Sequence, residues 1–215
     1  MVQKSVKPAR GRPRAYDPRT ALDAATGAFW QKGFSGTSLD ELSAATGMNR
    51  PSLYGAFGDK RALYLTTIER YVKGGRQAME AALADDLPLR EGLLRVYETA
   101  LGIYYPAGET PRGCFLVGTA ATEAVNDEEI RTRLNEGLRT FDQAFEARFK
   151  LAREAGELDA HANPAMLARI ASAVLHTLAL RSRTGDARSA LRATAEAGIA
   201  LICGPAPKKK AARPK

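Results

Sequence analysis

Cysteine and histidine are almost absent from this sequence, since its 215 residues contain two of each. The two cysteines, Cys114 and Cys203, cannot build a disulfide framework and are typical of a reducing compartment. Together with the histidines they lie too far apart in sequence to match the ligand spacing of a zinc site. No pattern joins a nucleophile to a base or forms a phosphate-binding loop. We therefore expect no enzyme, no catalytic residue, no metal and no cofactor.

Long apolar runs are also missing, and β-branched or aromatic runs are scarce. No stretch approaches the roughly 20 apolar residues that span a bilayer. The basic N-terminus lacks the apolar segment of a secretory signal. Ala, Leu, Glu and Arg dominate a composition that is otherwise ordinary for a folded protein, so we expect an all-α protein. From the two cysteines and the missing apolar segments, we expect it to be cytoplasmic and to have no membrane partner.

Positive charge is concentrated at the two ends of the chain. The net charge is +8, of which residues 1–20 carry +5 and residues 204–215 another +5, so the segment between them carries −2. Basic tails are attracted to polyanions through counterion release. The arginines Arg10, Arg12 and Arg14 alternate with glycine and proline as in the core of an AT-hook, which lies extended in a minor groove. For the C-terminal tail, a solubilising role is an equally good interpretation.

Two helices are predicted directly after the basic arm. Asp17 and Pro18 are suited to the cap and first turn of the first helix, and Gly33 to its end. Ser38 and Glu41 have the spacing of a capping box at the start of the second helix.

A tight turn then leads into a third helix. Gly47 can adopt a positive φ in this turn, and Asn49 is a suitable cap for a helix over residues 50–57. We expect Leu53 to be buried against the first two helices. Two short helices around a glycine-containing turn form a helix-turn-helix, whose second helix reads DNA.

Six further helices are expected, and their ends are marked by capping residues, proline and glycine. They run from a cap at Asp59 to about Ala84, from Pro88 to about Tyr105, from Pro111 to about Ala124, from an Asn126–Glu129 capping box to Gly156, from Asn163–Pro164 onward, and from a cap at Asp186 to Gly204. The adjacent Gly74 and Gly75 indicate either a hinge or close packing. The inner stripe of the long helix before Gly156 is Ile130, Leu134, Leu138, Phe141, Phe145 and Phe149.

The region from Ala21 to Leu63 resembles the TetR family of transcriptional regulators. The resemblance is carried by Phe29-Trp30-Gln31-Lys32-Gly33-Phe34, Gly36-Thr37-Ser38-Leu39, Ala45-Thr46-Gly47-Met48-Asn49, Ser52-Leu53-Tyr54 and Phe57-Gly58-Asp59-Lys60-Arg61-Ala62-Leu63. It implies a DNA-binding domain, a linking fourth helix, a helical effector-binding core, and a homodimer formed by the last two helices. It also implies repression that a small ligand relieves.

These expectations give an all-α chain of about nine helices. We expect a basic flexible arm over residues 1–16, a helix-turn-helix DNA-binding domain over 17–62, a helical ligand-binding and dimerisation domain over 63–204, and a basic tail over 205–215.

The third helix supplies most of the expected contacts with double-stranded DNA. Arg50 can offer two parallel donors to guanine, while Pro51 and Ser52 can touch a thymine methyl group or a nearby base edge. Tyr54 can donate to a phosphate, as the family's tyrosine does. A surface-solvated Arg50 and a core Tyr54 are the structural alternatives.

Further DNA contacts are expected around this helix. Thr37 and Ser38, with the main-chain amides that follow them, would seat a phosphate, and Lys60 would reach a flanking one. Family members often carry bulky residues where this chain has Gly55-Ala56. Because Gly55 and Ala56 offer weaker contacts with DNA, we expect Arg50 and the basic arm to supply more of the binding.

Residues of the effector site are expected in the helical core. The candidates are Tyr97, Tyr104, Cys114, Phe115, Phe141, Phe145 and His176. A helix N-terminus and Arg112 would favour the thiolate of Cys114, which reacts with electrophiles. Plain core positions remain the alternative for the aromatic residues, and a buried inert thiol remains the alternative for Cys114.

The last two helices carry apolar stripes that predict a homodimer on a near-palindromic operator. The stripes consist of Ile170, Val174, Leu178, Leu191, Ala195, Ile199 and Ile202, which exceed what a monomer could bury, and Gly198 would allow close approach. The sequence thus predicts a sequence-specific regulator, in the form of a repressor released by a small molecule, with an electrophile as one option. An architectural DNA-binding protein that uses its basic arm and tail is the alternative.

Overall fold

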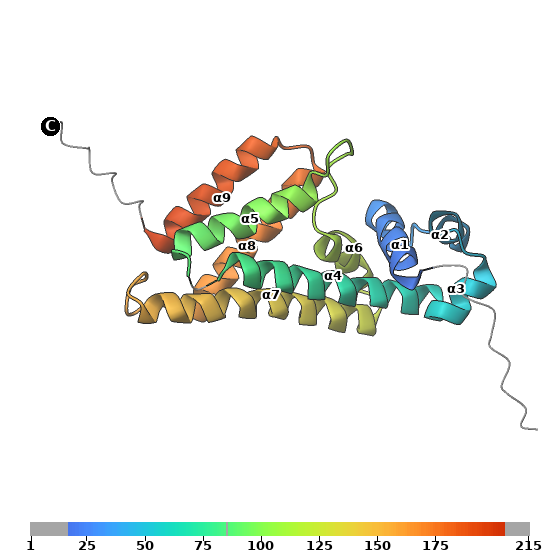
Figure 1. Ribbon diagram of the computed structural model, residues 1–215, viewed down its shortest axis with the longest axis horizontal. Coiled ribbons are helices and arrows are strands. Elements are labelled where there is room, and N and C mark those ends of the chain that lie inside the picture. The colour runs from blue at the N-terminus through green and yellow to red at the C-terminus, as the bar shows by residue number, and fades with distance from the viewer. Residues whose placement is uncertain (1–16, 85, 205–215) are drawn as a thin grey trace, which may run out of the picture.

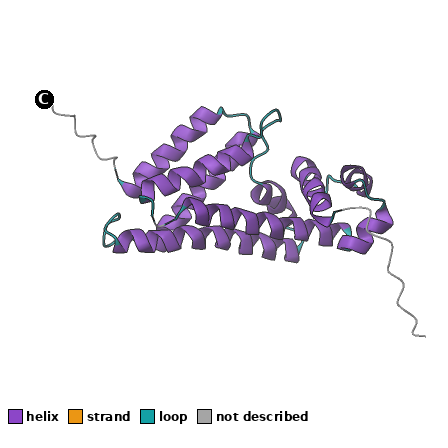
Figure 2. Cartoon of the chain, in the orientation of Figure 1, coloured by secondary structure: helices purple, strands orange, loops and turns teal. Residues whose placement is uncertain are grey.

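The computed structural model describes residues 17–84 and 86–204. Within these ranges the chain forms nine α-helices and no strand (Figure 1, Figure 2), which confirms the all-α prediction. The first three helices, α1 (Pro18–Lys32), α2 (Leu39–Thr46) and α3 (Arg50–Phe57), gather at one end of the molecule. None of the helices in these ranges is long and apolar enough to cross a bilayer.

A larger helical unit continues from this end. The long α4 (Lys60–Ala82) leads into it, so a division after residue 62 would fall in the first turn of that helix. The other members are α5 (Leu89–Tyr104), α6 (Phe115–Glu123), α7 (Glu128–Glu154), α8 (Pro164–Arg183) and α9 (Arg188–Cys203). Helix α7 lies along α4 and α8, while α9 packs against α5 and α8 (Figure 1).

The first four helices begin at the caps that the sequence predicts. Asp17, Asn49 and Asp59 each accept a hydrogen bond from an amide in the first turn that follows. Ser38 and Glu41 form the predicted capping box, in which each side chain bonds the other's main-chain amide. These local bonds satisfy amides that have no partner within the helix, and so they fix where each helix starts.

Two predicted caps are wrong. Asp127, rather than Asn126, caps α7, and its carboxylate accepts from the amides of Glu129 and Ile130, both at 3.0 Å. The last helix starts after Ala187 and has no side-chain cap, because Asp186 instead accepts a hydrogen bond from Arg181.

Helix α6 starts at Phe115, four residues later than Pro111. The intervening Gly113 has a φ of +66°, and a Cβ at this position would lie 2.5 Å from the carbonyl oxygen of Ala179. The segment before α6 is therefore held against α8 in a conformation that only glycine tolerates.

The inner face of α7 supplies much of the core. Ile130, Phe141, Phe145 and Phe149 are buried, whereas Leu134 and Leu138 are half-buried. One of the two adjacent glycines of α4 faces this stripe, because a Cβ on Gly75 would lie 2.9 Å from the Phe141 ring. Close packing therefore explains Gly75, while Gly74 faces open space.

The apolar stripes of α8 and α9 are largely used within the subunit, so the expectation that one subunit cannot bury them is wrong. Leu178, Leu191, Ala195, Ile199 and Ile202 are buried, since α9 also packs against α5. The glycine at 198 brings α9 close to Val174 of α8 within the same chain. Ile170, in contrast, is 46% exposed.

Candidate nucleic-acid interface and internal cavity

Helix α3 presents one polar face outward because its opposite face is anchored. Leu53 is buried against the neighbouring helices, while Arg50, Pro51 and Tyr54 are exposed and Ser52 is half-buried. Tyr54 is 46% exposed, so it is not a core residue. The leading end of α3 is thus an open, polar surface of the kind that can enter a DNA groove.

The Arg50 guanidinium is held at the junction of α2 and α3. Its Nε and Nη2 atoms donate to the same Asp40 oxygen, Oδ1, at 3.2 and 2.7 Å. Both side chains remain more than half exposed. Arg50 is therefore oriented by a neighbour and is not simply solvated.

Thr37 does not offer its hydroxyl to solvent as the sequence suggests. The side chain is buried, and the hydroxyl donates to the carbonyl of Gly33 at 2.6 Å. The exposed Ser38 hydroxyl accepts from the Glu41 amide at 3.2 Å. Hydrogen bonds from Lys32 and Ser38 lower the pKa of Glu41 to about 2, which keeps the capping carboxylate ionised.

The remaining predicted DNA contacts have different surroundings. Lys60, the first residue of α4, places its ammonium 4.5 Å from the centre of the Phe34 ring. Burial lowers the pKa of this lysine, although Glu123 and Glu41 counteract the effect. Arg10, Arg12 and Arg14 lie outside the described residues.

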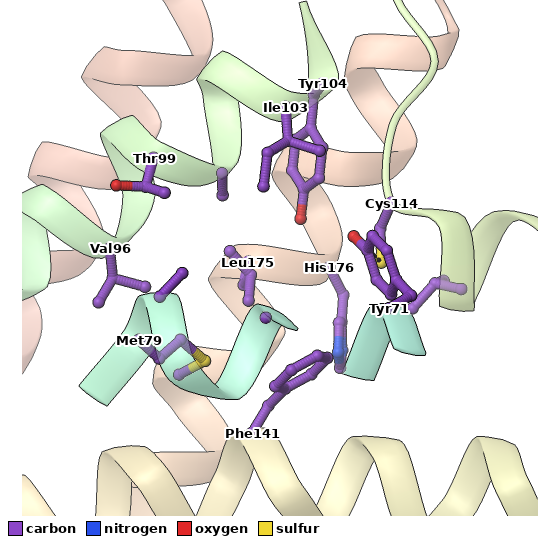
Figure 3. A pocket seen from close by; sticks show the side chains of 14 residues that line it. Tyr71, Met79, Val96, Thr99, Ile103, Tyr104, Cys114, Phe141, Leu175 and His176 are labelled. Atoms are coloured by element: carbon purple, nitrogen blue, oxygen red, sulfur yellow. Dashed lines mark hydrogen bonds between the residues drawn. The ribbon is translucent and has the colours of Figure 1, made fainter. Parts of the chain in front are cut away.

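A cavity lies inside the larger helical unit, between α4, α5, α6, α7 and α8 (Figure 3). It is lined by Tyr71, Gly75, Ala78, Met79, Val96, Thr99, Ala100, Ile103, Tyr104, Cys114, Val117, Phe141, Leu175 and His176. The cavity volume is about 50 Å³, which is room for a few water molecules. No Asp, Glu, Lys or Arg occurs among these lining residues.

The cavity brings together four of the seven residues expected at an effector site: Tyr104, Cys114, Phe141 and His176. Figure 3 shows the Tyr104 hydroxyl pointing into the space, with Cys114 beside Tyr71. Burial lowers the pKa of His176, which favours the neutral imidazole.

The other three expected residues are core residues outside the cavity lining. The Tyr97 hydroxyl donates to the carbonyl of Ala171 at 3.1 Å. The Phe145 ring stacks on Phe149 with their centres 6.1 Å apart. Phe115 packs against the Trp30 ring at 5.4 Å. Helical spacing alone does not distinguish such positions from a cavity wall.

The surroundings of Cys114 do not favour a thiolate. Burial raises the pKa of the thiol, even though hydrogen bonds from the Tyr71 hydroxyl, at 3.3 Å, and from the amides of Leu116 and Val117 lower it. Arg112 does not supply the expected charge, because its guanidinium lies 4.1 Å from the centre of the Trp30 ring.

Several cavity residues were not anticipated from sequence. On α5, Val96, Ala100 and Ile103 recur at helical spacing and share the face that lines the cavity. This spacing was the available signal, but it also fits ordinary core positions. Tyr71 of α4 carried no signal, because only the arrangement in space brings it to Cys114.

Family models match both parts of the chain. Residues 21–67 match the model described as "Bacterial regulatory proteins, tetR family", and residues 91–197 match "Tetracyclin repressor-like, C-terminal domain". The chain is 30% identical over 181 residues to the HTH-type transcriptional repressor ComR of Escherichia coli, covering 84% of this chain and 86% of that protein. It is 36% identical to the repressor BdcR of the same organism, over 62% of this chain and 64% of BdcR.

Solved structures agree with these matches. A cysteine mutant of the TetR family transcriptional regulator CifR, complexed with 26-bp double-strand operator DNA, is 31% identical with a TM-score of 0.75, covering 87% of this chain and 98% of CifR. Reduced NemR of E. coli has the same fold, with a TM-score of 0.76 at 22% identity over 86% of this chain and 95% of that one. The chain therefore belongs to the TetR family and is a helix-turn-helix DNA-binding regulator of transcription.

Proposed function

We propose that this protein is a homodimeric repressor that acts in the cytoplasm, binds a near-palindromic operator and leaves it when a small molecule enters the internal cavity. The observation that carries the DNA-binding part is the exposed Arg50 at the start of a capped α3. Side chains at the leading end of such a helix meet base edges in the major groove. The names of the relatives ComR and BdcR, both repressors, support the same direction of control.

The proposed DNA contacts divide into reading and positioning roles. Arg50 reads guanine, with Pro51 and Ser52 beside it. Tyr54 and Lys60 contact phosphate groups, as do Ser38 and the main-chain amides at the start of α2. Arg10, Arg12 and Arg14 follow an adjacent minor groove. Thr37 contributes through its main chain, since its hydroxyl is bonded internally.

The proposed dimer uses what α8 and α9 leave uncovered. Met166, Ile170 and Leu180 of α8 are 46–53% exposed, and Leu201 of α9 is 84% exposed. A second copy would bury these apolar side chains and form a four-helix bundle. The two copies of α3 would then lie about one helical turn of DNA apart, roughly 34 Å. In this scheme residues 17–62 bind DNA, and residues 63–204 bind the ligand and the partner subunit.

The proposed effector is a small neutral molecule. A charged ligand would lose hydration without gaining an opposite charge, because the lining residues carry no ionised side chain. Tyr71, Tyr104 and Cys114 can satisfy one polar group at one end of the cavity, and apolar side chains line the rest. A ligand larger than a few heavy atoms would have to widen the cavity.

Selection of bound sequences from random DNA tests the DNA-binding proposal. We expect a near-palindromic site, and Arg50→Ala should cost about 1–3 kcal/mol of binding to it while relaxing the preference for one base in each half. Arg76→Ala is the matched control, because it removes an equally exposed arginine from the outer face of α4. Equal weakening by Arg50→Ala on random DNA would instead support an architectural protein.

A further inference from the structure

We infer that Asp40 is the positioning residue that aims the Arg50 guanidinium at its base, so that Asp40 sets specificity without touching DNA. This inference rests on the proposed function, in which Arg50 reads the operator. It assigns a role to an acidic residue in a surface that must approach a polyanion.

The pattern of donors carries the argument. A guanidinium has five N–H groups, arranged along two edges that can each hold a pair of acceptors. Asp40 Oδ1 accepts from Nε at 3.2 Å and from Nη2 at 2.7 Å, which occupies the edge nearest the chain. No other described residue accepts a hydrogen bond from the outer edge, which is formed by both Nη atoms. Its two donors match the O6 and N7 acceptors of guanine.

The fold holds both partners firmly in place. Asp40 lies in the first turn of α2, behind the Ser38 capping box, and Arg50 is the first residue of α3 after the Asn49 cap. Leu42 and Leu53 anchor the two helices in the core. The Cα positions of the pair are therefore fixed, and only the Arg50 side chain has to be ordered.

The ion pair between Asp40 and Arg50 contributes little to folding stability. Both side chains are more than half exposed, and exposed ion pairs contribute little to folding. Among the described residues, Asp40 forms an ion pair only with Arg50. A carboxylate at a DNA surface also repels phosphate groups, which weakens binding to every sequence alike. If Asp40 aims Arg50, its removal changes the preference between bases. This effect distinguishes the aiming role from general repulsion, which changes the affinity for all sequences.

The test is a double-mutant cycle with Asp40→Asn, Arg50→Ala and the combined variant. Competition binding would measure relative affinities for the selected operator and for its three alternatives at the position that Arg50 reads. We expect Asp40→Asn to reduce the preference for guanine several-fold, by up to about tenfold, at an unchanged melting temperature. In the Arg50→Ala background the same substitution should leave the preference unchanged. Asp23→Asn, which removes another exposed acid from the DNA-binding end, should not alter base preference.

Three results would overturn the inference. In the first, Asp40→Asn strengthens binding to all sequences and leaves the preference intact, which would make Asp40 a competitor for Arg50. In the second, Asp40→Asn changes the preference equally in the presence and absence of Arg50. In the third, Arg50→Ala itself leaves the base preference unchanged, a result that also removes Arg50 as the reader. The first two results leave the proposed repressor function intact. Failure of the Asp40 inference can therefore be distinguished from failure of the proposed function.

Discussion

The indole nitrogen of Trp30 lies 3.2 Å from the carbonyl oxygen of Gly113, the residue that precedes Cys114. The same N–H is shared with the carbonyl of Arg112, also at 3.2 Å. The Trp30 ring packs edge-on against Tyr71, with their centres 5.3 Å apart. Through this one side chain, α1 of the DNA-binding end therefore touches Tyr71 of the cavity wall and the residue next to Cys114, so a change in that wall reaches α1 directly.

Trp30 should report occupancy of the cavity, because it is the only tryptophan in the chain. A small neutral ligand that displaces Tyr71 or Cys114 changes the surroundings of the indole, so we expect a change in emission intensity or wavelength on titration. Ala100→Leu fills the cavity from α5 and should abolish the change. A ligand that still altered emission in this variant would bind elsewhere, and the proposed effector site would be wrong.

The adjacent glycines of α4 should respond in opposite ways to alanine. Gly74→Ala should stabilise the protein by about 1 kcal/mol, because nothing lies within 4 Å of the added methyl group and alanine favours helix. Gly75→Ala places the same group 2.9 Å from the Phe141 ring and should gain nothing or destabilise. Chemical unfolding measures both. Equal stabilisation by both substitutions would show that Phe141 moves away freely. Disturbing the close packing of α4 on α7 would then cost no stability.

Cys114 should react slowly with thiol reagents at neutral pH. Burial raises the pKa of its thiol, and the side chain is only 6% exposed, whereas Cys203 is partly exposed. The variants Cys203→Ser and Cys114→Ser separate the two rates in alkylation followed by mass spectrometry. A Cys114 rate close to that of a free thiol would favour an electrophilic effector. Release from DNA by an electrophile that persisted in Cys114→Ser would reject sensing through this residue.

An ion-pair network ties the start of α4 to the start of α7. Arg61 donates to both carboxylate oxygens of Asp127, at 2.7 and 2.8 Å, and to Glu129 at 2.5 Å. Hydrogen bonds from Arg61 hold the pKa of Asp127 well below its usual range. A group whose pKa is lowered by folding stabilises the folded state above its unfolded pKa.

This contribution should therefore be complete above about pH 4, the usual range for aspartate, and should be lost as the pH falls further. Arg61→Gln should flatten the dependence of the unfolding free energy on pH in that acidic window. Arg76→Gln, which removes a partner of Glu80 within one helix, is the control and should leave the dependence unchanged. An unaltered pH profile in Arg61→Gln would show that the network contributes nothing to the pH dependence of the unfolding free energy.

Local signals predicted the DNA-binding end in detail, because its helices are short and each begins at its own cap. Ser38 with Glu41, and Asn49 before Arg50, define α2 and α3 within a few residues. The prediction of Asp186 as a cap is wrong because an aspartate also serves in turns, and here Arg181 binds it.

The cavity could be predicted only in part. Apolar spacing marks which face of a helix is turned inward, but it does not show where facing helices fail to touch. Phe145 and Phe141 follow one another on the same stripe of α7, yet only Phe141 lines the cavity. The pKa of the Cys114 thiol could not be predicted from the neighbouring sequence. It depends on burial and on a hydrogen bond from Tyr71, which lies far away along the chain.

The basic arm offers a prediction that depends on the sequence alone. Residues 1–14 contain five Lys or Arg and no acid. If the arm follows a DNA groove, its binding to phosphate groups releases counterions, and its deletion should reduce the slope of log affinity against log salt by about 0.9 for each phosphate that the arm neutralises. Binding titrations at several salt concentrations measure this slope. Deletion of residues 205–215 removes a similar charge from the other end of the chain and is the matched control. A slope that falls equally in both deletions would indicate general charge attraction, whereas an unchanged slope in the first would show that the arm stays off the duplex.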